Sequence, residues 1–400
     1  MIKSAAEEEG NTVFPIVLLA VAGFSVVTTE FLIIGVLPSL ARDLQVSVSG
    51  AGVLITLFAF TVAMVGPILT ALLSRFNRKH LFVFALMIFA VANALAALAP
   101  NIGVMALARF IPALALPVFW SLASVTAIDL SKPEKAGQAV SIVNFGVVTA
   151  TLFGIPAGTV IGDAFGWRSA FAILACLALV KALALFLFLP SLPTKTQVLS
   201  ISTQIKILKS PLVFMHLTVS ILLFTGMFIA YTYLADLLER LGGYDGTETG
   251  VALMTFGLVG LIGNWLGGKA VDWDPLGATL IFGVVLAVSL LALVPSIPLW
   301  FALAPALGIW GLAQTALLII CHVRLMKVGS QAPAFAASLN ISAVNVGIGM
   351  GAIIGGYIVR TIGAEYLGVI GALAICVAVG LALSLMVERT NSDLSKYIEP

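Results

Sequence analysis

Charged residues are scarce in this chain. Of its 400 residues, 10% are Asp, Glu, Lys or Arg and 61% are hydrophobic. Soluble globular proteins have about 25% charged and about 45–50% apolar residues. The composition therefore excludes an ordinary soluble domain and predicts an integral membrane protein. A net charge of only +2 offers no basic surface to a nucleic acid, so we expect no such partner.

Cysteine and histidine are also rare, with three residues of each. Cys176, Cys321 and Cys376 lie in apolar runs at unrelated spacings, which indicates small buried hydrophobes and not disulfides or metal ligands. The sequence lacks the His/Glu cluster of an intramembrane hydrolase and the Gly-x4-Gly-Lys-Ser/Thr loop of an ATPase. We expect no metal site, no cofactor and no ATP drive, and an intramembrane enzyme or receptor is the least favoured class.

Long apolar runs are what the chain has in abundance. A bilayer core is about 30 Å thick and requires about 20 apolar residues per helix. Twelve runs meet this requirement: 13–38, 50–73, 81–99, 103–127, 137–162, 168–189, 212–237, 248–269, 276–296, 299–321, 335–359 and 364–387. A polar linker, 191–211, separates the six-helix halves 1–190 and 212–400. Residues 201–208 in it fit either plain linker or a short interfacial helix.

Lysine and arginine are unevenly divided between the two sides of this arrangement. With the N-terminus inside, fourteen of the twenty lie on the cytoplasmic side, Arg324 among them, and four lie outside. The other two, Arg109 and Lys181, lie within runs. By the positive-inside rule both termini are cytoplasmic.

Glu30, in Thr28-Thr29-Glu30-Phe31, is the one ionisable residue of the first run. A carboxylate at membrane depth costs about 2.5–3.5 kcal/mol, which indicates a functional site with a partner. The alternative is a protonated, hydrogen-bonded packing residue. At a rise of about 1.5 Å per residue, Glu30 and Arg109 both lie about 7–9 Å outward of the centres of their runs. We therefore predict that they form an ion pair. We expect Lys181 to be a structural residue that reaches the cytoplasmic interface.

A shift of 197 residues aligns the chain with itself. It superimposes six pairs: Gly66 and Gly263, Ala139 and Ala336, Ser141 and Ser338, Gly154 and Gly351, Gly158 and Gly355, and Gly166 and Gly363. The shift is half the chain length, which indicates duplication of a six-span unit. We therefore predict an all-α integral membrane protein with twelve transmembrane helices in two pseudo-symmetric halves. The same shift places Met227 opposite Glu30, so the second half has no equivalent acid.

The fifth run, from Gly146 through Gly154 and Pro156 to Gly158, resembles the G-x(7)-G-x-P-x-G signature of the drug/proton antiporter branch of the major facilitator superfamily. Glycines on one helix face allow close approach of a neighbouring helix, and Pro156 bends the helix. The resemblance implies the major facilitator fold, with this helix taking part in conformational change.

The segment from Thr70 to Lys79 resembles the superfamily's cytoplasmic G-x-L-A-D-R-x-G-R-K loop. Arg75 and Arg78 match, Ser74 replaces the acid, and the second-half counterpart keeps Asp272. The resemblance implies a gating role, although topology alone explains the basic residues equally well. Thr28-Thr29-Glu30-Phe31 and Phe119-Trp120-Ser121 resemble bacterial sugar-efflux and purine-nucleoside-efflux carriers, which implies a bacterial inner (plasma) membrane.

Polar and aromatic residues within the runs are candidates for lining a substrate cavity. Apolar walls with a few amides and hydroxyls suit a small amphipathic molecule, although helix–helix hydrogen bonding explains each residue equally well. The candidates are Thr28, Phe119, Trp120, Asn144, Tyr231, Tyr233, Gln314, Asn340 and Asn345. We expect Asp236 to be a solvated charge at the outer end of its run.

Together these features predict a monomeric secondary transporter in the lipid bilayer. It exports a small organic molecule, such as a drug, sugar or nucleoside, in exchange for protons, so a proton gradient takes the place of a cofactor. Multidrug resistance and sugar transport are the corresponding physiological settings. Glu30 and Arg109 couple proton uptake to alternating access. A proton symporter or facilitator with Glu30 in the substrate site is the alternative.

Overall fold

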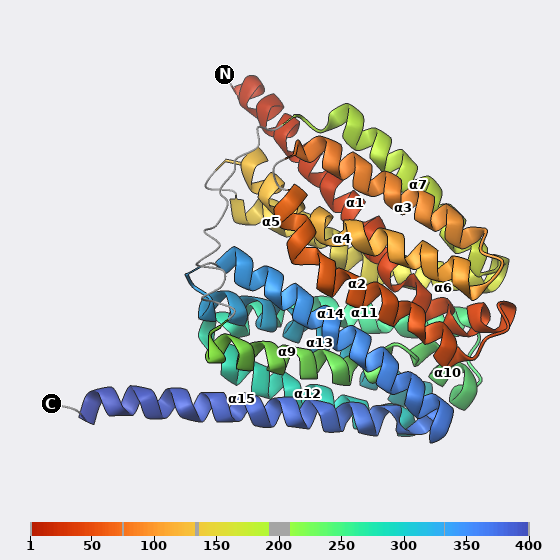
Figure 1. The fold of residues 1–400 in the computed structure, drawn as a ribbon, viewed down its shortest axis with the longest axis vertical. Helices are drawn as coiled ribbons and strands as arrows, with labels where there is room; N and C mark the ends of the chain where they lie inside the picture. The colour runs from red at the N-terminus through yellow and green to blue at the C-terminus, as the bar shows by residue number, and fades with distance from the viewer. Residues whose placement is uncertain (1, 74–75, 133–135, 192–208, 332, 399–400) are drawn as a thin grey trace. The chain divides into compact units, whose positions relative to one another are not determined.

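The computed structural model describes residues 2–73, 76–132, 136–191, 209–331 and 333–398, and this part of the chain contains helices and no strands (Figure 1). Twelve helical segments within it are long and apolar enough to cross a membrane, which confirms the predicted number of spans. Most of the predicted linker 191–211, with the alternative helix at 201–208, and the predicted gating residue Arg75 lie outside the described residues.

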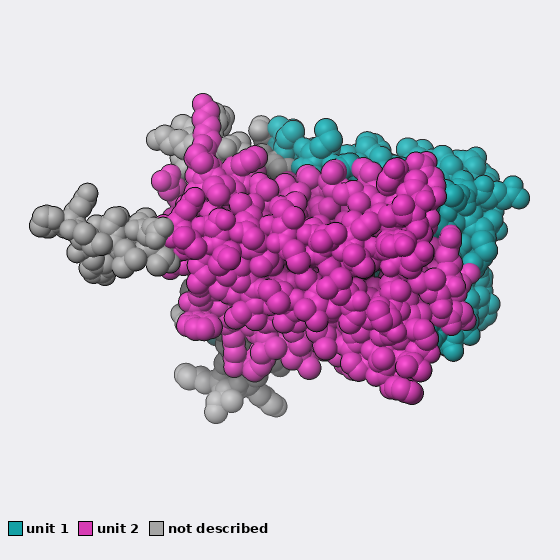
Figure 2. Space-filling view, turned by 90° about the horizontal axis from the view of Figure 1, so that it is seen from below, with its two compact units in different colours: residues 1–198, 244–254 teal, residues 199–243, 255–400 magenta. Residues whose placement is uncertain are grey.

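The chain divides into two compact units, residues 1–198 with 244–254 and residues 199–243 with 255–400 (Figure 2). The first unit contains α1 (Ile2–Asp43), α2 (Val48–Leu73), α3 (Arg78–Ala97), α4 (Ile102–Leu130), α5 (Ala136–Thr149), η2 (Ala150–Gly154), α6 (Ile155–Phe165) and α7 (Trp167–Phe188). The second contains α9 (Pro211–Tyr231), α10 (Leu234–Gly242), α12 (Pro275–Ser296), α13 (Trp300–Val328), α14 (Pro333–Thr361), η3 (Ala364–Tyr366) and α15 (Leu367–Ile398). Helix α11 (Gly246–Trp273) begins in the first unit and continues in the second.

Several helices begin at a polar side chain that caps their free N–H groups. Asn101 accepts a hydrogen bond from Val104 N at 3.0 Å at the start of α4, and Asp274 accepts bonds from Leu276 N and Gly277 N at the start of α12. Such caps satisfy donors that have no partner inside the helix. They explain why these helices start where they do after short loops.

The fifth span is interrupted by the π-helical turn η2, immediately before Pro156. Proline has no N–H, and its ring clashes with the carbonyl four residues earlier in a regular α-helix. The wider π turn accommodates this break inside the span.

Glycines of the fifth span allow it to pack tightly on α1 within the first unit. A Cβ atom at Gly146 would overlap the carbonyl of Ala20, and one at Gly154 would overlap the hydroxyl of Thr28. Further along, a Cβ at Gly158 would overlap the side chain of Leu32. Only glycine permits this close approach along the helix.

The second unit repeats this packing between α14 and α9. Gly351 lies against the main-chain carbonyl of Thr225, at the position where Gly154 lies against the side chain of Thr28. The two threonines are 197 positions apart, and each donates its hydroxyl to the carbonyl four residues earlier, at 2.7 Å for Thr28 and 2.8 Å for Thr225. The repeat predicted from the sequence is therefore visible in the internal packing of each unit.

Candidate functional site

Glu30 lies in the middle of the first membrane span, on α1, with its side chain half-buried. Among the described residues its carboxylate accepts no hydrogen bond and forms no ion pair; the bond that Glu30 does accept is at its main-chain carbonyl. The neighbouring Thr29 is fully buried. The acid is thus held by its backbone, while its carboxylate remains available.

Arg109 reaches this part of α1 from α4, and only 1% of its surface is exposed. Its Nη1 donates to the carbonyl of Thr29 at 2.5 Å and its Nη2 to the carbonyl of Glu30 at 2.6 Å. The guanidinium carbon also lies 4.4 Å from the ring centre of Phe58, a favourable position for a cation. The rigid fork of arginine suits two neighbouring acceptors.

The structure therefore confirms that Glu30 and Arg109 are in contact, but the predicted ion pair between their side chains is wrong. The two residues meet, and their opposite charges are close enough to attract. However, the guanidinium of Arg109 donates to main-chain oxygens. Among the described residues, it therefore forms no ion pair with the carboxylate of Glu30. The backbone carbonyls, which no sequence pattern displays, compete successfully for the arginine.

A buried amide, which the sequence analysis missed, completes this polar group. Asn93 on α3 donates to the hydroxyl of Thr29 at 3.0 Å and to the carbonyl of Phe89 at 2.8 Å. Thr29 therefore joins α1 to both α3 and α4. An amide within an otherwise apolar run was the available signal, because polar groups buried in a membrane need hydrogen-bond partners.

Lys181, expected to reach the cytoplasmic interface, instead turns inward. Its Nζ donates to the hydroxyl of Ser25 on α1 and lies 5.1 Å from the ring centre of Phe24. The prediction of a snorkelling lysine is wrong, because a hydroxyl and an aromatic ring on the adjacent helix offer the ammonium closer partners than the interface does.

The other predicted cavity residues of the first unit differ in their surroundings. Thr28 is buried against the fifth span. Phe119 is buried between Phe82 and Trp120, with ring centres 5.5 and 5.4 Å away. Asn144 is exposed. Substrate contact by these residues stays a prediction.

In the second unit Tyr231 belongs to an aromatic cluster. Its ring stacks on Phe256 at 5.0 Å, and Trp310 packs edge-on against both. Trp310 also donates from Nε1 to the side-chain oxygen of Gln314 at 3.0 Å. Two predicted substrate residues, Tyr231 and Gln314, are therefore brought together through Trp310.

Three further predicted substrate residues of the second unit have partners inside that unit. Tyr233 donates its hydroxyl to the carbonyl of Ala352 at 2.9 Å. Asn340 accepts from the hydroxyl of Ser220 at 3.0 Å. Asn345 donates to its own helix, and its side-chain oxygen is buried without a hydrogen bond. The structure gives each of them a packing role, and any substrate contact remains a prediction.

Asp236 is not the solvated charge that the sequence suggested. It is buried and accepts a bond at 2.7 Å from Nε of Arg240, one turn later on α10. The chain breaks its helix at 232–233, between α9 and α10, and this break turns the acid inward.

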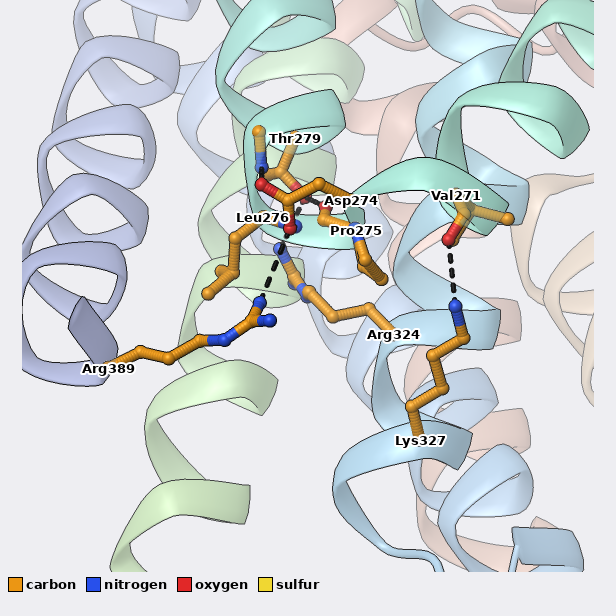
Figure 3. Close-up of polar contacts among 9 residues, drawn as sticks. Val271, Asp274, Pro275, Leu276, Thr279, Arg324, Lys327 and Arg389 are labelled. Carbon is orange, nitrogen blue, oxygen red and sulfur yellow. Dashed lines mark hydrogen bonds and ion pairs between the residues drawn. The ribbon is translucent and has the colours of Figure 1, made fainter. Parts of the chain in front are cut away.

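Arg324, counted on the cytoplasmic side from the sequence, is a second fully buried arginine. Helix α13 continues to Val328, and 1% of Arg324 is exposed. Figure 3 shows its guanidinium at the start of α12, where Nη1 donates to the hydroxyl of Thr279 at 2.8 Å. Nη2 donates to the carbonyl of His216 and the hydroxyl of Ser220 on α9. The residue thus connects α9, α12 and α13.

The predicted gating residues have different contacts. Asp272 is exposed. The neighbouring Asp274 caps α12 and pairs with Arg389 of α15 at 3.4 Å, as Figure 3 shows. In the first unit Arg78 is buried and pairs with Asp129, at the end of α4, at 2.7 Å. Asp129 was missed because it follows an apolar run without any motif of its own.

The described residues contain no group of three or more His, Cys, Asp or Glu that could hold a metal ion. The site consists of one free carboxylate, a buried guanidinium and a half-buried amine in the first unit. Such isolated charges inside a membrane are suited to carrying protons or binding a charged group.

Comparison with known proteins gives a consistent result. The Major Facilitator Superfamily model matches residues 19–330. The chain is 32% identical over 386 residues to the MFS-type transporter YtbD of Bacillus subtilis (strain 168), covering 94% of this chain and 96% of that protein. It is 32% identical over 374 residues to the inner membrane transport protein YdhP of Escherichia coli (strain K12), covering 93% and 95%. A solved structure of a bacterial homologue of the human lysosomal transporter Spinster, inward-facing and occupied, superimposes with a TM-score of 0.75 at 18% identity, covering 93% and 96%. At that identity the last likeness shows the fold alone.

Proposed function

Since this chain belongs to the major facilitator superfamily and is a multi-pass membrane transporter, we propose that it exports a small organic molecule in exchange for protons. The family and fold are those of transporters and not of enzymes. The inner membrane of a bacterium is the proposed location, with both termini in the cytoplasm because lysine and arginine are concentrated on that side.

One observation supports this proposal most strongly: the carboxylate of Glu30 is left without a hydrogen bond or ion pair in the described residues, while its backbone is fixed by Arg109. A proton-coupling acid must gain and lose a proton without unfolding its helix. A carboxylate that forms no hydrogen bond or ion pair with the helices around it meets this requirement. The nearby guanidinium attracts the ionised form, and this attraction is removed when the acid is protonated.

Proton uptake by Glu30 then changes the charge balance between α1 and α4. With Glu30 ionised, Arg109 and the acid together are neutral; with Glu30 protonated, Arg109 is an uncompensated charge in the first unit. The cost of that charge favours a different packing of α1. The glycine-lined contact of α1 with the fifth span is the surface on which such a repacking takes place.

We propose a small amphipathic substrate, in the class of drugs, sugars and nucleosides. In the second unit the ring cluster of Tyr231, Phe256 and Trp310 carries the amide of Gln314. Aromatic faces beside a single polar group are typical of sites for such molecules. A monomer is the proposed working state.

A proton symporter or facilitator is the second candidate, and the same free carboxylate favours it, because Glu30 is also available to bind a substrate directly. A thermal-shift screen of the purified protein against drugs, sugars, nucleosides and amphipathic metabolites identifies a ligand. Addition of that ligand to proteoliposomes loaded with a pH indicator then distinguishes the candidates. Antiport moves protons opposite to the ligand, symport moves them with it, and a facilitator moves none.

A further inference from the structure

Lys181 is a half-buried amine inside a span of the first unit, and the proposed mechanism assigns it no task. Its ammonium lies inside a span, bound to the hydroxyl of Ser25 and above the ring of Phe24. Both partners are on α1, and neither carries a charge. A hydroxyl can accept from an ammonium and can also donate to a neutral amine, so this contact survives loss of the proton from Lys181.

Apart from Glu30 and the exposed thiol of Cys176, the other ionisable groups near α7 are engaged elsewhere or lie at helix ends. Helix α7 packs against α3, α1 and α6. Apart from Lys181, the ionisable residues on 13–43 of α1 and on α3, α6 and α7 are Arg78, Lys79 and His80 on α3, Glu30, Arg42 and Asp43 on α1, Asp163 on α6, and Arg168 and Cys176 on α7. Arg78 pairs with Asp129, Asp43 with Arg168, and Lys79 lies over the ring of Phe186. Glu30 alone is an acid in the interior of α1.

Lys181, on α7, contacts α1 at a different depth from Glu30, and the two depths are offset along the direction of proton flow. The amine contacts Ser25, which precedes Glu30 by five residues, or about 7.5 Å along the helix axis. With the N-terminus in the cytoplasm, Lys181 lies on the cytoplasmic side of Glu30. Arg109 binds α1 at Glu30, the outer position, and Lys181 binds it at Ser25. An arginine keeps its proton, whereas a buried lysine can release one.

We propose that Lys181 is a second proton-carrying residue: Glu30 takes up a proton from the outer side, and Lys181 releases one toward the cytoplasm. This inference rests on the proposed antiport. An O–H bond forms on the Glu30 carboxylate, an N–H bond breaks on the Lys181 ammonium, and the released proton passes to water. Release comes first, so Glu30 takes up its proton while Lys181 is neutral. The formal charge of Glu30, Arg109 and Lys181 together is +1 before the two steps and +1 after them, so no additional charge accumulates in the membrane.

Infrared spectroscopy of the purified protein tests this inference without a substrate. The carboxylic acid band of Glu30 is followed as a function of pH in the wild type and in Lys181→Arg, Lys181→Met and Lys79→Arg. In Lys181→Arg the positive charge cannot leave, so the pH at which half the band is present falls by about one unit for charges about 10 Å apart. In Lys181→Met and in the matched control Lys79→Arg it stays within a few tenths of a unit of the wild type.

Two results overturn the inference. If the half-point of the Glu30 band is the same in Lys181→Arg as in the wild type, Lys181 keeps its proton and has only a structural role. If Lys181→Met, which needs no space for a guanidinium, raises the half-point by about one unit, the lysine is a fixed charge. Glu30→Gln tests the proposed function separately, since persistence of the band in that variant would mean that Glu30 is not the proton site, whatever Lys181 does.

Discussion

The guanidinium of Arg109 binds the main-chain carbonyl of Glu30, at 2.6 Å, and not its carboxylate. The second donor of the same fork binds the carbonyl of Thr29 at 2.5 Å. The arginine therefore fixes the position of α1 whether or not Glu30 carries a proton. Because the backbone of Glu30 is held and its acid is free, the residue can gain or lose a proton while its helix stays in place.

Arg109→Ala should reduce stability, membrane yield and transport together. The substitution removes two charge-assisted hydrogen bonds and leaves a cavity beside Phe58, at a cost of about 2–4 kcal/mol. Thermal unfolding in detergent and the yield of folded protein measure the effect. Arg109→Lys should recover only part of the stability, because an ammonium lacks the planar fork. Wild-type yield and transport in Arg109→Ala would contradict the assigned role.

Gly154→Ala should destabilise the first unit by about 1–3 kcal/mol through overpacking against Thr28. Thr28→Ala in the same chain removes the overlapping hydroxyl and methyl, so the double variant should regain most of the loss. Gly146→Ala meets the backbone of Ala20 instead and should not be rescued by Thr28→Ala. Gly380→Ala is the control, since a Cβ there meets nothing within 4 Å.

These glycine variants are compared by chemical denaturation in detergent. Equal losses for Gly154→Ala with and without Thr28→Ala would show that the helices do not meet at this pair of residues.

Thr279→Val should cost about 1–3 kcal/mol, because it leaves Nη1 of the buried Arg324 without an acceptor. The same change in an Arg324→Met background should cost much less, since no buried donor is left unpaired. A double-mutant cycle on the free energy of unfolding measures this coupling. Thr218→Val, which removes an exposed hydrogen bond from a half-buried threonine to its own helix, is the control. Additive losses would mean that the bond does not contribute to stability.

The fold was largely predictable because the signals that determine it are local. Twelve apolar runs give twelve spans. The 197-residue shift pairs Gly154 with Gly351, and the two glycines contact Thr28 and Thr225, which are paired by the same shift. Glycines recur at this interval because each unit contains the same close contact between two helices.

The chemistry of the site was harder to predict. Depth alone brought Glu30 and Arg109 together, but the acceptors that Arg109 uses are carbonyls, which every residue has. The partners of Lys181 and Arg324 were not predictable, because a sequence shows where a charge lies along a helix and not which side chains it faces. Asn93 was not predicted, although it is a polar residue within the apolar run 81–99.

The central claim, that Glu30 carries the transported proton, is tested most directly by proton movement in proteoliposomes. A ligand found by thermal shift is added to vesicles containing the wild type or Glu30→Gln, and the internal pH is recorded. Both proteins should fold and show the ligand-induced thermal shift, because the carboxylate bears no packing bond. We predict proton movement opposite to the ligand for the wild type and a loss of at least about tenfold for Glu30→Gln. Full pH-dependent exchange by Glu30→Gln would contradict the claim.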